Sequence, residues 1–213
     1  VLAGWSSGSN YPLLGSIRST AQMVSYQVAM GLALVAVLLY SGHLRMSEIV
    51  AQQDKIWNVI PQFPAFVIYL ICGLAETNRP PFDLPEAESE LVAGYHTEYS
   101  SMKFAMFFMA EYINVIVASA MTVTLFFGGW SFPGFTPHGV AGALLSIVIF
   151  TIKTLFFVWL FVWVRWTLPR FRYDQLMSLG WRVMLPTALA YIVIIAAAVL
   201  VLESAGIRRG AMY

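Results

Sequence analysis

Five long apolar runs constrain what this chain of 213 residues can fold into. A helix needs about 20 mostly apolar residues to cross the hydrocarbon core of a bilayer. Runs of roughly this length lie at 21–40, 57–74, 104–127, 140–163 and 183–202. Only 11% of the residues are charged, against about 25% in soluble domains. We predict an all-α fold, in which residues 1–213 form one polytopic membrane bundle of about five transmembrane helices.

Two places in this pattern are less regular than the rest. Pro61 and Pro64 stand in the first turns of the second run, where early helical N–H groups lack intrahelical partners and proline is tolerated. Residues 4–12, rich in Gly and Ser, are typical of a loop that precedes the first run. Because no initiator methionine or signal peptide opens the chain, we interpret it as part of a longer protein that has further upstream spans.

The Lys and Arg residues between the runs predict the orientation, because positive loops stay on the cytoplasmic side. Five spans alternate the sides of the membrane. One side carries Arg18, Arg79, Lys103, Arg165, Arg170, Arg172 and Arg182. The other side carries Arg45, Lys55, Arg208 and Arg209. This bias puts the loop at residues 76–103 in the cytoplasm, or in a matrix equivalent to it.

That loop is strongly acidic. The chain has 11 acidic residues, and six of them lie there: Glu76, Asp83, Glu86, Glu88, Glu90 and Glu98. Clustered carboxylates beside a bilayer are stable when they are hydrated, paired or partly protonated. Together with Arg79 and His96, they suit a hydrated proton path; a solvated acidic surface is the alternative. Asp83 followed by Pro85 predicts the start of a helix.

Two charged residues fall inside apolar runs. Glu111 lies about 10 Å from the cytoplasmic end of its span, and Lys153 about 15 Å from the same side, at 1.5 Å per residue. These depths predict that the two can pair if their helices face each other. Intramembrane charges often mark a proton route, whereas a static pair that fixes packing is the alternative. Gln27 is a polar residue in the first span, with a role in either interhelical hydrogen bonding or function.

The sequence offers no candidate for a bound metal or redox cofactor. Cys72 is the one cysteine, so neither a disulfide nor a cysteine-based metal or iron–sulfur site can form within the chain. No nucleotide-binding glycine motif occurs, and no histidine pair has the spacing for intramembrane haem. The last loop, at 165–182, is basic, which suits contact with anionic lipid or a soluble partner.

Residues 76–91, which read ETNRPPFDLPEAESEL, closely resemble the H subunit family of bacterial NADH-quinone oxidoreductase, respiratory complex I. The resemblance continues at 94–100, 102–104, 110–112, 125–130, 153–154 and 168–177, and upstream at 4–7, 11, 13–15, 18 and 21–26. It covers nearly the whole chain and corresponds to the C-terminal part of the family. One position departs from it, because Gln27 stands where the family usually has Glu.

The resemblance implies a function that the residues alone only suggest. The family helps to form the chamber in which quinone is reduced, and it couples that reduction to proton translocation. By resemblance, Arg18, Arg79 and Asp83 belong to the quinone chamber. The proton path or coupling would use Glu76, Glu86, Glu88, Glu90, Glu98, Glu111 and Lys153. Since Gln cannot exchange a proton, the proton path that the resemblance implies would lack a titrating group at position 27.

The implied partners are other complex I subunits: those of the peripheral arm at the quinone site and the antiporter-like subunits of the membrane arm. Flavin and iron–sulfur clusters are expected in those partners, with ubiquinone or menaquinone as substrate and no nucleic acid. The implied place is the cell inner membrane. An alternative is the homologous membrane subunit of a membrane-bound hydrogenase or formate hydrogenlyase. A secondary transporter is a third possibility, but the paired repeats typical of that class are not found.

Overall fold

The computed structural model describes residues 2–78, 81–83, 97–133 and 139–204. Their helices are α1 (Leu2–Ser6), α2 (Asn10–Ser41), α3 (Met46–Gln52), α4 (Phe63–Glu76), α6 (Ser101–Phe126), α7 (Gly139–Thr167), α8 (Tyr173–Ser178), η2 (Leu179–Met184) and α9 (Leu185–Ser204). No β-strand occurs within these ranges. Segments 10–41, 101–126, 140–167 and 173–204 are long and apolar enough to cross a membrane, and α4 is a shorter apolar helix. The predicted polytopic helical bundle is confirmed.

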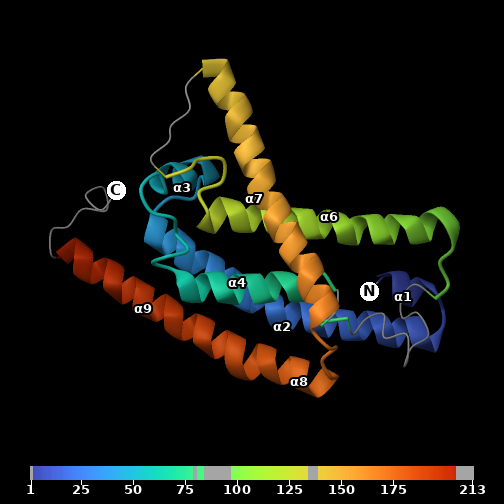
Figure 1. The fold of residues 1–213 in the computed structure, drawn as a ribbon. Helices are drawn as coiled ribbons and strands as arrows, with labels where there is room; N and C mark the ends of the chain where they lie inside the picture. The colour runs from blue at the N-terminus through green and yellow to red at the C-terminus, as the bar shows by residue number, and fades with distance from the viewer. Residues whose placement is uncertain (1, 79–80, 84–96, 134–138, 205–213) are drawn as a thin grey trace.

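Helix α2 is the centre of the bundle. It packs along α4 and α9, whereas α6 packs against α7 and α4, and α7 crosses the others steeply (Figure 1). Ala29, Ala33 and Ala36 of α2 are fully or almost fully buried. Without a hydrophobic driving force between helices in lipid, such small residues let backbones approach closely and gain van der Waals contacts. The core continues into α4 with Ala65 and Cys72.

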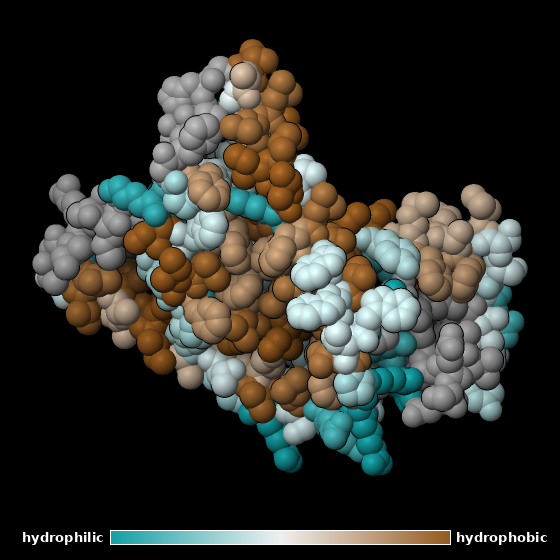
Figure 2. All heavy atoms as spheres, in the orientation of Figure 1, coloured by the Kyte–Doolittle hydropathy of each residue, from teal (hydrophilic) through white to brown (hydrophobic). Residues whose placement is uncertain are grey.

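The outer surface is apolar, as expected for a protein whose solvent is lipid. Figure 2 shows hydrophobic side chains over the upper part of α7 and the C-terminal part of α9, at the left. Hydrophilic residues gather near α3 and α8. On α7, Leu144 and Ile152 are each 62% exposed. These side chains would be out of place on a soluble domain, but they suit contact with acyl chains.

The second apolar run begins its helix later than its hydropathy suggests. Residues 58–62 form turns, and α4 starts at Phe63 with Pro64 in its first turn. A side chain of this turn segment forms a hydrogen bond with the last turn of α6. The Asn58 amide nitrogen donates to the carbonyl oxygen of Leu125 at 3.1 Å. Side-chain bonds of this kind satisfy backbone groups outside a helix and so favour the non-helical start.

The prediction of a loop at residues 4–12 is wrong for most of that range. Helix α1 runs to Ser6, and α2 begins at Asn10. Only a short turn separates them, where Gly8 adopts a positive φ of 65°. Glycine takes this left-handed conformation without steric cost. The Gly- and Ser-rich composition therefore marks a tight turn between two packed helices.

Candidate functional site at the C-terminal end of α4

A buried glutamine holds the start of the acidic loop at residues 76–103, here called the acidic segment. Gln22 of α2 is 1% exposed, and its Nε2 donates to the carbonyl oxygens of Ala75 and Phe82, each at 2.9 Å. Ala75 is in the last turn of α4, and Phe82 lies beyond it. One side chain thus satisfies carbonyls on both sides of the point where the chain leaves the helix, which fixes the direction in which it leaves.

Aromatic side chains complete this anchor. The ring of Phe82 lies between those of Tyr26 and Phe171, with centroids 5.6 Å away in both cases. The hydroxyl of Tyr26 donates to the carbonyl oxygen of Leu176 at 2.8 Å. The backbone N–H of Phe171 donates to the carbonyl oxygen of Pro81 at 3.1 Å. The acidic segment and the basic segment around Arg170 and Arg172 are therefore joined at this point.

Two predicted carboxylate residues, one on α4 and one on α6, lie near the C-terminal end of α4. Glu76 is the last residue of α4 and is partly buried. Asn114 of α6 donates from its amide nitrogen to the backbone carbonyl of Glu76 at 3.4 Å. Glu111 lies one turn before Asn114, on the same face of α6, and is 9% exposed. The structure thus brings Glu76 and Glu111 to the same α4–α6 contact.

The far end of the acidic segment is attached to α1. The Tyr99 hydroxyl donates to the carbonyl oxygen of Ala3 at 3.1 Å and lies 2.9 Å from the hydroxyl of Ser6. Helix α1 lies directly on α2, since a Cβ on Gly4 would overlap Pro12 and Ser16. Both ends of the segment are therefore tied to the α1–α2 unit. Glu98, beside Tyr99, is exposed.

The remaining predicted residues are distributed around this junction. Arg18 is partly buried, one turn before Gln22 on α2, and Asp83 is partly buried directly after Phe82. Arg79, Glu86, Glu88, Glu90 and the helix start predicted at Pro85 lie outside the described residues. Gln27 is exposed on the surface of this chain, although Tyr26 beside it is buried.

Lys153 is not paired with Glu111, so that prediction is wrong. Its Nζ donates to the carbonyl oxygens of Phe127, Gly129 and Ser131 at 2.8, 3.2 and 2.6 Å. Phe127 follows Glu111 by 16 residues along α6, which is about 24 Å of helix. The depth argument failed because α7 crosses the other helices steeply (Figure 1). The Nζ of Lys153 therefore reaches the carbonyl oxygen of Phe127, which follows the C-terminal end of α6.

Lys153 instead binds the C-cap of α6, Phe127, and the turn that follows it, which contains Gly129 and Ser131. The last carbonyls of a helix lack intrahelical partners and carry a partial negative charge, which a cation offsets. The Nζ of Lys153 also lies 5.3 Å from the ring centroid of Trp57. Gln53 supports the same turn, because its Oε1 accepts from the backbone N–H of Gly128 at 2.9 Å. This arrangement suits a structural role.

Sequence reasoning missed Gln22, Phe82 and Gln53. For the two glutamines, the available signal was a polar amide at the edge of an apolar region, which costs free energy unless its hydrogen bonds are made. The sequence does not say which backbone carbonyls such an amide reaches. Within the described part of the chain, no group of three or more His, Cys, Asp or Glu residues could hold a metal ion.

Comparisons with known proteins give consistent matches over most of the chain. The model of the NADH dehydrogenase family matches residues 1–196. A curated relative from Frankia casuarinae (strain DSM 45818 / CECT 9043 / HFP020203 / CcI3), named as the H subunit of NADH-quinone oxidoreductase, is 54% identical over 199 residues, which are 92% of this chain and 44% of that protein. A relative of the same name from Frankia alni (strain DSM 45986 / CECT 9034 / ACN14a) has the same identity and coverage. The chain thus spans less than half the length of these relatives.

Proposed function

Because this chain belongs to the NADH dehydrogenase family, we propose that it forms part of the H subunit of a proton-translocating NADH-quinone oxidoreductase. The resemblance seen in the motif at 76–91 is confirmed at the level of the family and of the relatives' names. In this proposal the chain lines the quinone chamber and couples quinone reduction to proton movement.

The anchor at Gln22 is the observation that carries the chamber proposal. A chamber for a hydrophobic substrate at a membrane surface needs a wall whose backbone stays in place while polar groups face the headgroup. Gln22 holds Ala75 and Phe82 together, and Phe82 packs against Tyr26 and Phe171. Arg18 and Asp83 flank this anchor, where they would bound the chamber together with Arg79.

The coupling role rests on carboxylates that lie at the contact between α4 and α6, one partly buried and one buried. Quinone reduction takes up two electrons and two protons, so proton donors near the chamber change charge as the reaction proceeds. Glu76 and Glu111 lie at one helix contact, and because ionisable groups at such depth are costly, they often mark a proton route. We assign proton relay to these two, continued by Glu98 and the loop residues Glu86, Glu88 and Glu90. Lys153 would act in coupling only through the position of α6.

The partners follow from the chemistry of the reaction. The chain offers no redox group for electrons from NADH, so flavin and iron–sulfur clusters would belong to peripheral-arm subunits. Antiporter-like membrane-arm subunits would respond to the changes in charge that accompany quinone reduction in this chain. The substrate is ubiquinone or menaquinone. We place the acidic segment on the cytoplasmic side of the inner membrane, as the Lys and Arg bias predicts.

The composition of the purified complex tests this proposal. The tagged full-length protein is extracted in a mild detergent, and its partners are identified by mass spectrometry of the intact complex. Co-purification of the flavin- and NADH-binding subunits, with NADH-dependent quinone reduction, is the expected result. A nickel–iron subunit in their place would assign the chain to a hydrogenase or formate hydrogenlyase complex and overturn the proposal.

A further inference from the structure

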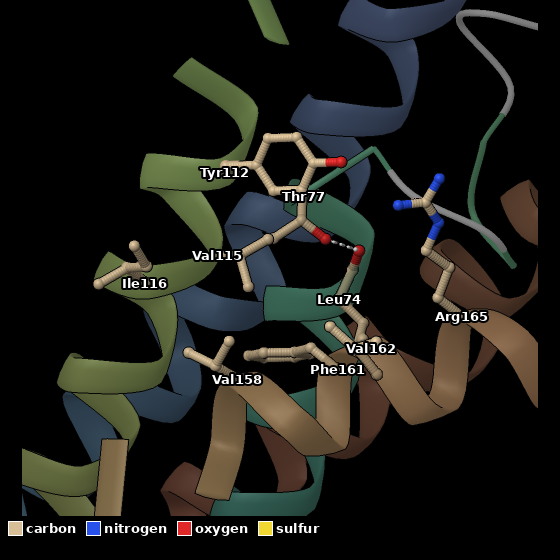
Figure 3. A pocket seen from close by; sticks show the side chains of 9 residues that line it. All are labelled: Leu74, Thr77, Tyr112, Val115, Ile116, Val158, Phe161, Val162 and Arg165. Carbon is tan, nitrogen blue, oxygen red and sulfur yellow. Dashed lines mark hydrogen bonds between the residues drawn. The ribbon is translucent and has the colours of Figure 1, made fainter. Parts of the chain in front are cut away.

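A cavity of about 140 Å³ lies where α4, α6 and α7 meet (Figure 3). Side chains from α6 and α7 face each other across it, with α4 between them. Its lining consists of Leu74, Thr77, Tyr112, Val115, Ile116, Val158, Phe161, Val162 and Arg165. Most of these side chains are apolar, so the space favours hydrocarbon over water.

The polar groups of the lining are not spread evenly. Thr77 and Tyr112 lie on one side, and Arg165 is at the end of the α7 wall away from Val158 (Figure 3). The Thr77 hydroxyl is already used, since it donates to the carbonyl oxygen of Leu74 at 2.8 Å. The guanidinium of Arg165 is the one cation among these lining residues. The cavity is therefore apolar along one length and positively charged at one end.

Tryptophan residues place that charged end at the level of lipid headgroups. Trp163 and Trp166 lie on either side of Arg165 in the sequence and are 55% and 79% exposed. Trp is enriched at membrane–water interfaces, where its ring sits at headgroup level. The Cζ of Arg165 lies 5.9 Å from the Trp166 ring. Val158 precedes Arg165 by about 10 Å of helix and so lies towards the bilayer core.

The cavity opens sideways onto the apolar surface between α6 and α7. Tyr112 and Ile116 on one wall are each 52% exposed, and Val162 on the other is 46% exposed. A molecule can thus enter from the bilayer without passing through the protein. A cavity of about 150 Å³ accommodates benzene, so this one has room for about six carbons of a chain.

We propose that this cavity binds part of one acyl chain of an anionic phospholipid, with the lipid phosphate held by Arg165. The apolar walls match the chain, and the guanidinium matches the phosphate in charge and in hydrogen-bond geometry. A quinone has a neutral headgroup and gains less from Arg165. The bound lipid would fill the contact between α6 and α7 next to Thr77, where the acidic segment begins.

Photo-crosslinking of lipid to the assembled complex in vesicles tests this site. The probe is phosphatidylglycerol with a photoactivatable diazirine in one acyl chain. Cross-linked peptides are expected to contain residues 112–116 and 158–165. Val158→Phe fills the cavity and should lower this labelling several-fold. Leu144→Phe, on the exposed part of α7, is the matched control and should retain it. Equal labelling in the Val158→Phe complex would overturn the proposal.

Arg165→Gln tests whether the charge of Arg165 selects an anionic lipid, or whether the cavity takes up the acyl chain of any lipid. In the parent complex, phosphatidylglycerol should label the cavity several-fold more than phosphatidylcholine carrying the same diazirine chain. The variant should lose this preference, whereas Arg182→Gln should keep it. Stronger labelling by a photoactivatable quinone than by phosphatidylglycerol would overturn the proposal, as would an unchanged preference in Arg165→Gln. If Val158→Phe lowers the yield of complex, Ile116→Phe at the rim replaces it.

Discussion

The side-chain Nε2 of Gln22 lies 2.9 Å from the backbone carbonyl oxygen of Phe82, so a buried amide of α2 holds the first residues of the acidic segment. The same nitrogen bonds the carbonyl of Ala75 in the last turn of α4. Because the anchor joins two helices and a loop, we expect its removal to affect both the stability of the complex and its turnover.

Replacing Gln22 by Leu keeps the volume of the side chain but removes both hydrogen bonds. Two buried carbonyls then lack their donor, and each such loss costs about 1–3 kcal/mol. We expect the thermal unfolding midpoint of the complex to fall and quinone reduction to decrease. Met23→Leu, at the exposed neighbouring position, is the control and should change neither. A Gln22→Leu complex with parental stability and activity would refute the anchor.

Tyr26→Phe tests the link between α2 and α8. The ring remains against Phe82, but the hydrogen bond to the Leu176 carbonyl at 2.8 Å is lost. We expect a modest destabilisation of about 1 kcal/mol, measured as a small fall in the unfolding midpoint. Tyr26→Ala also removes the ring contacts and should cost about 3–5 kcal/mol, as for other large-to-small core changes. Equal effects of the two substitutions would contradict a role for the ring.

Lys153→Met should act on the structure of α6. The carbonyls of Phe127, Gly129 and Ser131 lose their shared donor, so assembly into the complex is expected to decrease. Lys153→Arg, which keeps the charge, should recover part of the assembly. Subunit content in solubilised membranes measures both. Normal assembly of Lys153→Met with loss of proton translocation would instead favour a direct place in the proton path.

Combining Lys153→Met with Glu111→Gln tests whether the two residues interact. Because about 24 Å of helix separates Glu111 from the carbonyls that Lys153 bonds, their effects on stability should add within about 0.5 kcal/mol. The double-mutant cycle of unfolding midpoints, converted to free energies, gives the coupling. A coupling above about 1 kcal/mol would show that the residues communicate despite their separation.

Glu76→Gln and Glu111→Gln should reduce turnover more than assembly. Each substitution keeps the shape of the side chain and removes the titrating group, so a proton relay would stop at that position. Quinone reduction and proton translocation are measured on complexes with normal subunit content. Glu203→Gln, at an exposed position near the end of α9, is the control. If both variants pump at the parental rate, the proton-relay role of this helix contact is wrong.

The orientation can be measured by labelling a cysteine at Ser100, an exposed residue just before α6. The variant also carries Cys72→Ala, which removes the one native cysteine of these 213 residues. A membrane-impermeant thiol reagent should label it in inverted vesicles but not in intact cells. Labelling of intact cells from outside would reverse the predicted topology.

The sequence by itself determined the class of fold and the family. A bilayer demands long apolar helices because no water satisfies the backbone inside it, so hydropathy alone predicts the apolar helices. The motif at 76–91 identified the family, since a long ordered run of residues carries that information directly. Neither conclusion depends on how the helices face one another.

Only the tertiary structure decided which polar side chains meet. Gln22 and Gln27 are about 140° apart around α2, so one points inwards to Phe82 and the other outwards. Their neighbours in sequence do not tell which is which. Lys153 reached the far end of α6 because the crossing of α7, set by side-chain packing, overrides any estimate of depth made along single helices.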